Sequence, residues 1–173
     1  MPSHWVEVSK CCPQARRMAD RHYSYRGPRN RPHGQEVGPP GQKIVLLTSD
    51  GKAVWGSHRP APWAGLRRAD GIDAWCCFLY RNEGYSLARS SDLIREAVGI
   101  TIGRWGVAPQ GMVTYIGVDH VRGSNPGYCY LQAGWEHDGW VDSSQLGKLR
   151  RLLLPPSKCA EYAQEVPSTL VMA

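Results

Sequence analysis

The sequence predicts a single-domain α/β or α+β fold in which helices flank a mixed central sheet. Two observations carry this prediction. Segments with the period of amphipathic helices alternate with short apolar runs typical of strands, and 173 residues suffice for one domain with its own core. Apolar residues make up 42% of the chain and charged residues 21%, which excludes wholesale disorder, collagen and coiled coil.

The N-terminal third is predicted to hold a strand, a helix and a hairpin. Residues 5–8 form the strand, and a helix begins at Pro13, because proline at the first helical position loses no needed hydrogen bond. The helix runs to about His22, which the apolar spacing places on or beside the buried stripe. Residues 43–48 and 53–56 flank an Asp-Gly pair that favours a tight turn, so they predict a β-hairpin.

The rest of the chain continues the alternation. Residues 74–80 show no polar alternation, which is typical of a central strand covered on both faces. Ser90 and Ser91 can cap a helix that ends near Gly103 or Gly106. The later elements are expected to be a strand at 112–118, a short helix at 125–133, and strands at 135–141 and 149–154. Residues 1–156 thus form the predicted domain, with a basic loop at 24–42, and residues 157–173 a flexible tail.

Positive charge is concentrated near the N-terminus. The net charge is +6, and five of these charges fall in residues 1–35. Arginines outnumber lysines sixteen to five, and the guanidinium group matches phosphate in a bidentate manner, which favours a nucleic-acid partner. The loop arginines expected to contact DNA are Arg26, Arg29 and Arg31. A solvated surface encoded by a GC-rich genome has the same composition, so composition leaves both interpretations open.

The sequence also bears on location. The longest apolar run, 74–80, is far shorter than the roughly 18 residues of a membrane span, and the N-terminus lacks the pattern of a secretory signal. We therefore expect a cytoplasmic protein with no membrane partner. The six cysteines lack C-x-x-C spacing, so we interpret them as reduced, small buried hydrophobes.

Candidate catalytic residues gather at two points. His22 and Tyr23 lie where the first helix ends, and a histidine there is either a general base, a metal ligand, or a side chain packed at the helix end. Asp119 and Tyr130 follow a predicted strand, where polar site groups of open sheets collect. A turn role for Asp119 and a core role for Tyr130 remain open.

The junction after residues 74–80 is a candidate anion site. Backbone N–H groups at the start of the next helix can hold a phosphate or carboxylate. The side chains and backbone that would take part belong to Arg81, Gly84, Ser90 and Ser91. A simple capped turn would contain the same residue types.

Three stretches together resemble a known superfamily. Tyr130 precedes Gly134-Trp135 by four residues, which is similar to the C-terminal part of GNAT-type N-acyltransferases. Within that superfamily, His22-Tyr23-Ser24, the strand end at 115–119 and the Tyr130 segment resemble the phage Mom proteins. Those are GNAT-like enzymes that modify adenine in phage DNA and so shield it from restriction. The resemblance spans roughly residues 12–154.

The resemblance implies a role for each candidate. His22, Tyr23 and Asp119 match positions that the Mom family needs for activity, where iron binding has been proposed, so His22 and Asp119 become candidate iron ligands. Tyr130 matches the GNAT tyrosine that protonates the leaving thiolate. The region that receives the donor's phosphates matches Arg81, Gly84, Ser90 and Ser91.

The GNAT pyrophosphate loop, Gln/Arg-x-x-Gly-x-Gly/Ala, is matched by Arg81-x-x-Gly84-x-Ser86 except at its last position. The expected donor is therefore an acyl-CoA or another activated two-carbon compound. The resemblance and the basic loop together predict a transferase that adds a small acyl or carbamoylmethyl-like group to a nucleobase amine in DNA, adenine N6 first, and protects the DNA from restriction. The base would be flipped out or single-stranded.

Three alternatives stay open. The modified base can instead be an already hypermodified pyrimidine. A GNAT N-acetyltransferase for a small amine or a protein keeps the fold and changes the substrate. A non-catalytic, DNA-binding anti-restriction protein keeps the arginine loop and uses no donor.

Overall fold

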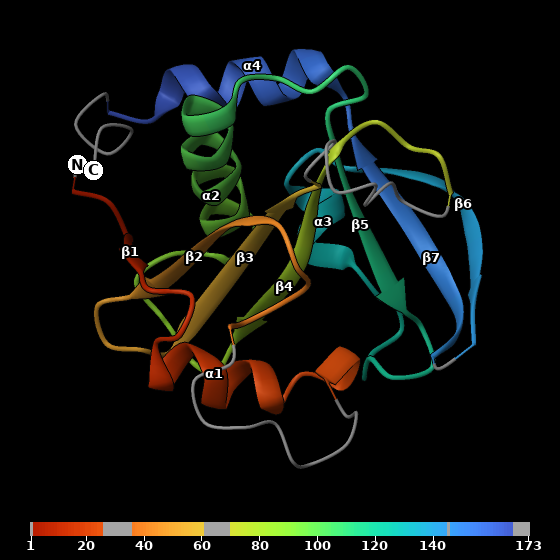
Figure 1. Ribbon diagram of the computed structural model, residues 1–173, viewed down its shortest axis with the longest axis horizontal. Coiled ribbons are helices and arrows are strands. Elements are labelled where there is room, and N and C mark those ends of the chain that lie inside the picture. Colours follow the sequence, from red (N-terminus) through yellow and green to blue (C-terminus); the bar gives the residue numbers. More distant parts are fainter. Residues whose placement is uncertain (1, 26–35, 61–69, 145, 168–173) are drawn as a thin grey trace.

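The computed structural model describes residues 2–25, 36–60, 70–144 and 146–167 (Figure 1). Over these ranges the chain forms one seven-stranded sheet in the order β1-β2-β3-β4-β5-β7-β6. Neighbouring strands are antiparallel except β4 and β5, which are parallel and joined by helix α2. This mixed sheet with flanking helices confirms the predicted fold class.

Apart from η1 and α4, the elements follow the predicted order, each within a few residues of its expected bounds. The strands are β1 (Trp5–Val8), β2 (Gln42–Thr48), β3 (Ala53–Arg59), β4 (Trp75–Asn82), β5 (Met112–Gly117), β6 (Glu136–Ser143) and β7 (Gly147–Leu154). The helices are α1 (Pro13–Asp20), the 3-10 turn η1 (Tyr23–Tyr25), α2 (Ser90–Trp105), α3 (Tyr128–Gln132) and α4 (Pro156–Glu165).

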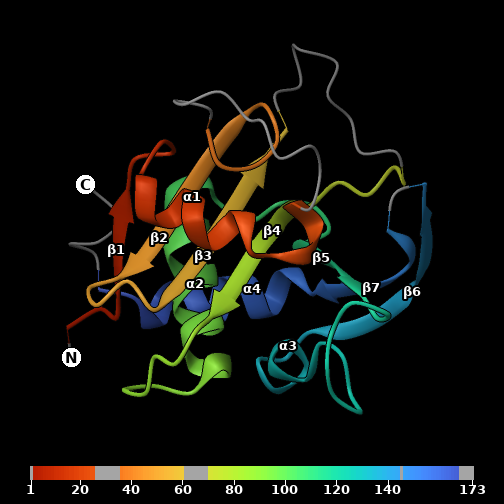
Figure 2. The ribbon, with the colours of Figure 1, turned by 90° about the horizontal axis from the view of Figure 1, so that it is seen from below.

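Helices cover the two faces of the sheet (Figure 2). The face under α1 buries a cluster in which Met18 packs with Val54 and Leu79. The opposite face, under α2, α3 and α4, buries a larger cluster that includes Trp55 and Tyr130. Strand β4 contributes to both clusters, as the lack of polar alternation in its sequence predicted.

Helix α4 is where the structure differs from the expected architecture. Residues 157–165, assigned to a flexible tail, belong to a helix that begins at Pro156, packs on α2 and buries Cys159 and Tyr162. Pro156 occupies its first turn, where proline is favoured. Gly99 of α2 lets the two helices approach closely, because a Cβ there would lie 2.4 Å from the Tyr162 carbonyl oxygen. Within the described ranges, none of the helices has the length and hydropathy needed to span a bilayer.

Two irregularities in β4 open the sheet. In the β3–β4 register Gly56 faces Leu79 and Ser57 faces Cys77, so Phe78 is the extra residue of a β-bulge. The parallel β4–β5 ladder holds two residue pairs, the second of which joins Cys76 and Val113. Beyond that point the strands diverge, and a cleft opens between them.

Candidate active site

The cleft between β4 and β5 holds a pocket with a volume of about 150 Å³. Half of the residues that line it are aromatic: His22, Tyr23, Phe78, Tyr80, Tyr115 and Tyr130. Among the described residues that line it, none carries a carboxylate, a guanidinium or an ammonium group. Three of the predicted site residues, His22, Tyr23 and Tyr130, thus share one pocket although they lie far apart in sequence.

His22 enters the pocket from the turn after α1. Its Nδ1 lies 2.6 Å from Ser24 Oγ, and its ring lies against that of Tyr23 with centroids 4.4 Å apart. Burial, and to a smaller extent the nearby charge of Arg81, lower the pKa of His22 to about 4. The imidazole is therefore neutral near pH 7, as a general base must be.

Tyr23 ties the turn after α1 to the end of β5. Its hydroxyl donates to the Tyr115 carbonyl at 3.3 Å and accepts from the Gly117 N–H at 2.9 Å. Its ring stacks on His120 with centroids 5.4 Å apart and planes 7° from parallel. Gly117 is required here, since a Cβ would lie 2.8 Å from Tyr23 Cε2. Tyr23 thus holds His22 against the cleft.

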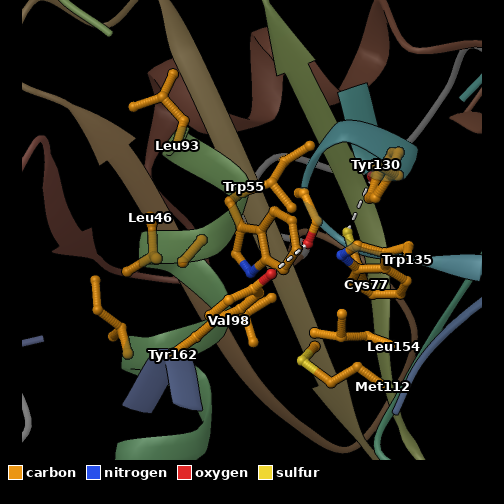
Figure 3. Close-up of a cluster of buried hydrophobic side chains, with 14 of the residues drawn as sticks. Leu46, Trp55, Cys77, Leu93, Val98, Met112, Tyr130, Trp135, Leu154 and Tyr162 are labelled. Atoms are coloured by element: carbon orange, nitrogen blue, oxygen red, sulfur yellow. Dashed lines mark hydrogen bonds between the residues drawn. The ribbon is translucent and has the colours of Figure 1, made fainter. Parts of the chain in front are cut away.

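Tyr130 reaches the pocket from the opposite face, in the first turns of α3. The residue is 6% exposed, and its hydroxyl lies 3.3 Å from Cys77 Sγ (Figure 3). Burial raises the pKa of Tyr130 well above its ordinary value, so the phenol keeps its proton at neutral pH. A neutral base and a protonated acid therefore line the same cleft.

Arg81 lies on the face that α1 covers. It pairs in register with Val54, which belongs to the cluster under α1, and it donates to the Arg21 carbonyl at 3.2 Å. Glu83 accepts from Arg81 Nε at 2.5 Å and from Arg21 at 2.7 Å through both oxygens. Two arginines thus share one carboxylate, and the charge of Arg81 acts on His22.

The side chain of Asn82 holds the turn before α2. Asn82 Oδ1 accepts from the N–H groups of Gly84 and Tyr85, at 3.0 and 2.8 Å, and its Nδ2 donates to Ser90 Oγ at 3.3 Å. Gly84 has φ +106°, a conformation that glycine adopts without strain. Ser90 and Ser91 begin α2, ahead of its first intrahelical bonds. They therefore lie near the cleft on the α2 face, opposite to the Arg81 side chain.

The remaining predicted residues lie elsewhere or outside the described ranges. Asp119 is exposed in the turn after β5 and does not line the pocket that His22 lines. In the described part of the chain, no three His, Cys, Asp or Glu side chains come together as metal ligands, so we derive no step through iron. The predicted DNA contacts lie outside the described residues: Arg26, Arg29 and Arg31.

The structure adds site residues that sequence reasoning missed. Tyr80 lines the pocket, and its hydroxyl is buried and has no hydrogen-bond partner among the described residues. The Thr114 hydroxyl donates to the Cys77 carbonyl at 2.9 Å where the β4–β5 ladder stops. The Tyr115 hydroxyl donates to Asp70. The apolar run 74–80 carried no signal for these contacts, because they depend on the bulge and on strand register.

Comparisons with known proteins bear on the fold. No known family profile and no curated protein matches the sequence. Among solved structures, a chimera of the spermidine N-acetyltransferase SpeG from Vibrio cholerae and hSSAT superposes with a TM-score of 0.54 and 8% sequence identity. The match covers 91% of this chain and 99% of that one. The fold is therefore GNAT-like, as the spacing around Tyr130 suggested.

Proposed function

We propose that the protein is an N-acyltransferase that moves an acyl group from a coenzyme A thioester to an amine. The observation that carries the proposal is the pairing of His22 and Tyr130 across the cleft of a GNAT-like sheet. One is a neutral imidazole and the other a phenol that retains its proton. The structurally similar spermidine N-acetyltransferase supports an amine as acceptor.

The proposed reaction is an aminolysis of the thioester. The amine nitrogen attacks the thioester carbonyl, so that the C–N bond forms and the C–S bond breaks. The nitrogen loses one proton, which the neutral imidazole of His22 takes up. The departing thiolate gains one proton from the Tyr130 hydroxyl. The two proton transfers restore a neutral amide and a free thiol.

The residues around the cleft fit an acyl-CoA donor. Past Cys76 the edge of β4 that faces β5 is not paired with it, so amide groups of an extended ligand can add to this edge as a strand does. The buried Tyr80 hydroxyl, without a partner among the described residues, offers one more hydrogen bond. Ser90 and Ser91 begin α2 close by, where backbone N–H groups suit a phosphate.

Binding and turnover test this proposal. Acetyl-CoA should raise the melting temperature of the protein in a concentration-dependent manner, and coenzyme A should be released when an acceptor amine is present. His22→Gln should keep the thermal shift and lower the rate by about a hundredfold or more. If neither acetyl-CoA nor any longer acyl-CoA shifts the melting temperature, the proposal is wrong.

A second, finer proposal concerns the acceptor, which we infer to be a nucleobase amine in DNA, adenine N6 first. The described pocket wall is aromatic and has no carboxylate, whereas a polyamine cation needs acidic partners. Aromatic walls instead suit a flipped base. The Arg21–Glu83–Arg81 cluster places positive charge beside His22, which favours a phosphate backbone over a cation.

Nucleoside mass spectrometry tests the acceptor. DNA from cells that express the protein should contain a new nucleoside, and expression of His22→Ala should abolish it; resistance of that DNA to restriction enzymes gives a second readout. Arg21→Gln should weaken DNA binding and reduce its salt slope by about one. Arg95→Gln is the matched control. Arg95 is also ion-paired, but its partner is Glu165 of α4, and both residues lie on the face of the sheet opposite to α1. Unmodified DNA together with acylated small amines would exclude the DNA proposal. If DNA from cells that express His22→Ala were as resistant to restriction enzymes as DNA from cells with the wild type, the protein would be non-catalytic.

A further inference from the structure

The peptide group that joins Arg21 to His22 is held at both of its polar atoms. Its carbonyl oxygen accepts from Nη1 of Arg81 at 3.2 Å, and its N–H donates to the Ala19 carbonyl at 2.9 Å. The bond to Ala19 continues the last turn of α1, whereas the bond from Arg81 comes from β4, sixty residues further along the chain. The main chain that carries the His22 side chain is therefore fixed by a contact between α1 and β4.

The carbonyl of Arg21 is the kind of group that needs such a donor. Arg21 is the C-cap residue of α1, and a helix leaves its last carbonyl groups without partners inside the helix. A guanidinium supplies the missing hydrogen bond, and its positive charge suits the negative end of the helix dipole. Arg81 thus ends α1 at the residue that precedes His22.

Glu83 orients the guanidinium of Arg81. One carboxylate oxygen of Glu83 accepts from Nε of Arg81 at 2.5 Å, and its two oxygens accept from Arg21 at 2.7 Å each. The main chain of Glu83 is anchored as well, since its N–H donates to the Lys52 carbonyl at 2.7 Å. Bidentate and networked ion pairs hold their geometry better than isolated surface pairs do. The Arg21–Glu83–Arg81 cluster therefore clamps the turn that carries His22 to the end of β4.

Arg81 itself supports the pocket from outside. It is not among the described residues that line the pocket, and it lies on the α1 face, whereas Ser90 and Ser91 begin α2 on the opposite face. Two of its three guanidinium nitrogens are bonded within the protein. This place suits support of His22 better than contact with the phosphates of a donor.

We propose that Arg81, oriented by Glu83, is a positioning residue for His22: its guanidinium fixes the peptide group from which the imidazole reaches the cleft. The inference rests on the proposed acyl transfer, in which His22 takes up the proton of the amine. It gives Arg81 a different role from the one that the GNAT resemblance implies. The charge of Arg81 acts in the same direction, because it lowers the pKa of His22 and so keeps the imidazole neutral.

NMR tests the contact without any assay of activity. The carbonyl carbon of Arg21 and the amide of His22 should shift in Arg81→Lys, because an ammonium group lacks the planar fork that reaches both the carbonyl and Glu83. Glu83→Gln should move the same two signals. Signals of α4, which lies on the other face, should keep their positions and so show that the fold is retained. If neither variant moves the signals of Arg21 and His22, the proposal is overturned.

Steady-state kinetics with acetyl-CoA test the role. Arg81→Lys should lower kcat about tenfold and leave both the KM for acetyl-CoA and its thermal shift unchanged, because the base is displaced and the donor site is not. Glu83→Gln should also lower kcat, and its addition to Arg81→Lys should cause no further loss, since both act through one contact. A raised KM for acetyl-CoA with an unchanged kcat would assign Arg81 to the donor's phosphates and overturn the proposal. Full activity of Arg81→Lys would overturn it too, because charge alone would then suffice.

Glu165→Gln is the matched control. Glu165 also accepts from an arginine through both oxygens, from Arg95 at 2.9 and 3.2 Å, but this pair joins α4 to α2 on the other face. Its kcat should equal that of the wild type, and a fall as large as that of Glu83→Gln would contradict the proposal. A wild-type protein that transfers no acyl group would refute the proposed function and the catalytic consequence of Arg81 with it. The NMR result would still decide whether Arg81 holds the turn.

Discussion

The neutral state of His22 makes a quantitative prediction about acid. The pKa of His22 is lowered from 6.5 to about 4, first by burial and then by Arg81. Between these two pH values the unfolded chain binds a proton at this site and the folded protein does not. The free energy of unfolding therefore falls as the pH drops from about 6.5 to about 4. The difference between the two pKa values corresponds to a loss of at most about 3 kcal/mol. The loss stays below this ceiling because His22 keeps some contact with water.

Two measurements check this value. In NMR, the ring protons of His22 should titrate with a midpoint far below 6.5, and Arg81→Met should raise the midpoint only partway, because burial is the larger cause. In denaturant unfolding, the wild type should lose more stability than His22→Gln between pH 7 and about 4, up to the same ceiling of about 3 kcal/mol. A His22 midpoint at or above 6.5, or equal losses in the two proteins, would refute the argument.

Three further predictions concern single positions. Gly99→Ala should destabilise the fold by about 1–3 kcal/mol in denaturant unfolding, because its Cβ would lie 2.4 Å from the Tyr162 carbonyl oxygen. Gly117→Ala should push Tyr23 away from the end of β5 and lower acyl transfer by about tenfold in steady-state kinetics. Ser57→Ala should lower the melting temperature at a cost of about 1–3 kcal/mol, since it leaves a buried tryptophan N–H without its acceptor at 2.6 Å.

Local pattern predicted most of the fold. The Asp-Gly turn and the apolar run 74–80 indicated a hairpin and a central strand, and both are present. Helix α4 lies in residues that were assigned to a flexible tail, although Pro156 occupies the first turn, where proline is favoured. Helix α4 has few apolar residues. Those it has, such as Cys159 and Tyr162, are buried because they pack in the same cluster as residues of α2.

The candidate site was less predictable, because it depends on one inserted residue. The bulge at Phe78 changes the alternation of β4, so that Cys77 lies in the cluster under α2 and Leu79 in the cluster under α1. The same shift places Arg81 toward α1 and Asn82 toward Ser90. Sequence reasoning assigned Arg81 to the donor phosphates, and no regular period of two or 3.6 residues could have revealed which face it occupies.

The two-pair ladder between β4 and β5 also has a consequence for how the molecule folds and comes apart. Strands β2 and β3 close through the short turn at 49–52, whereas the β4–β5 contact must wait for the whole α2 crossover. The seam between the two half-sheets is joined by two residue pairs, so it is the least protected part of the described sheet. Because the pocket lies in that seam, denaturant should open the cleft before it melts either half-sheet, and the proposed acyl transfer should vanish ahead of the secondary-structure signal.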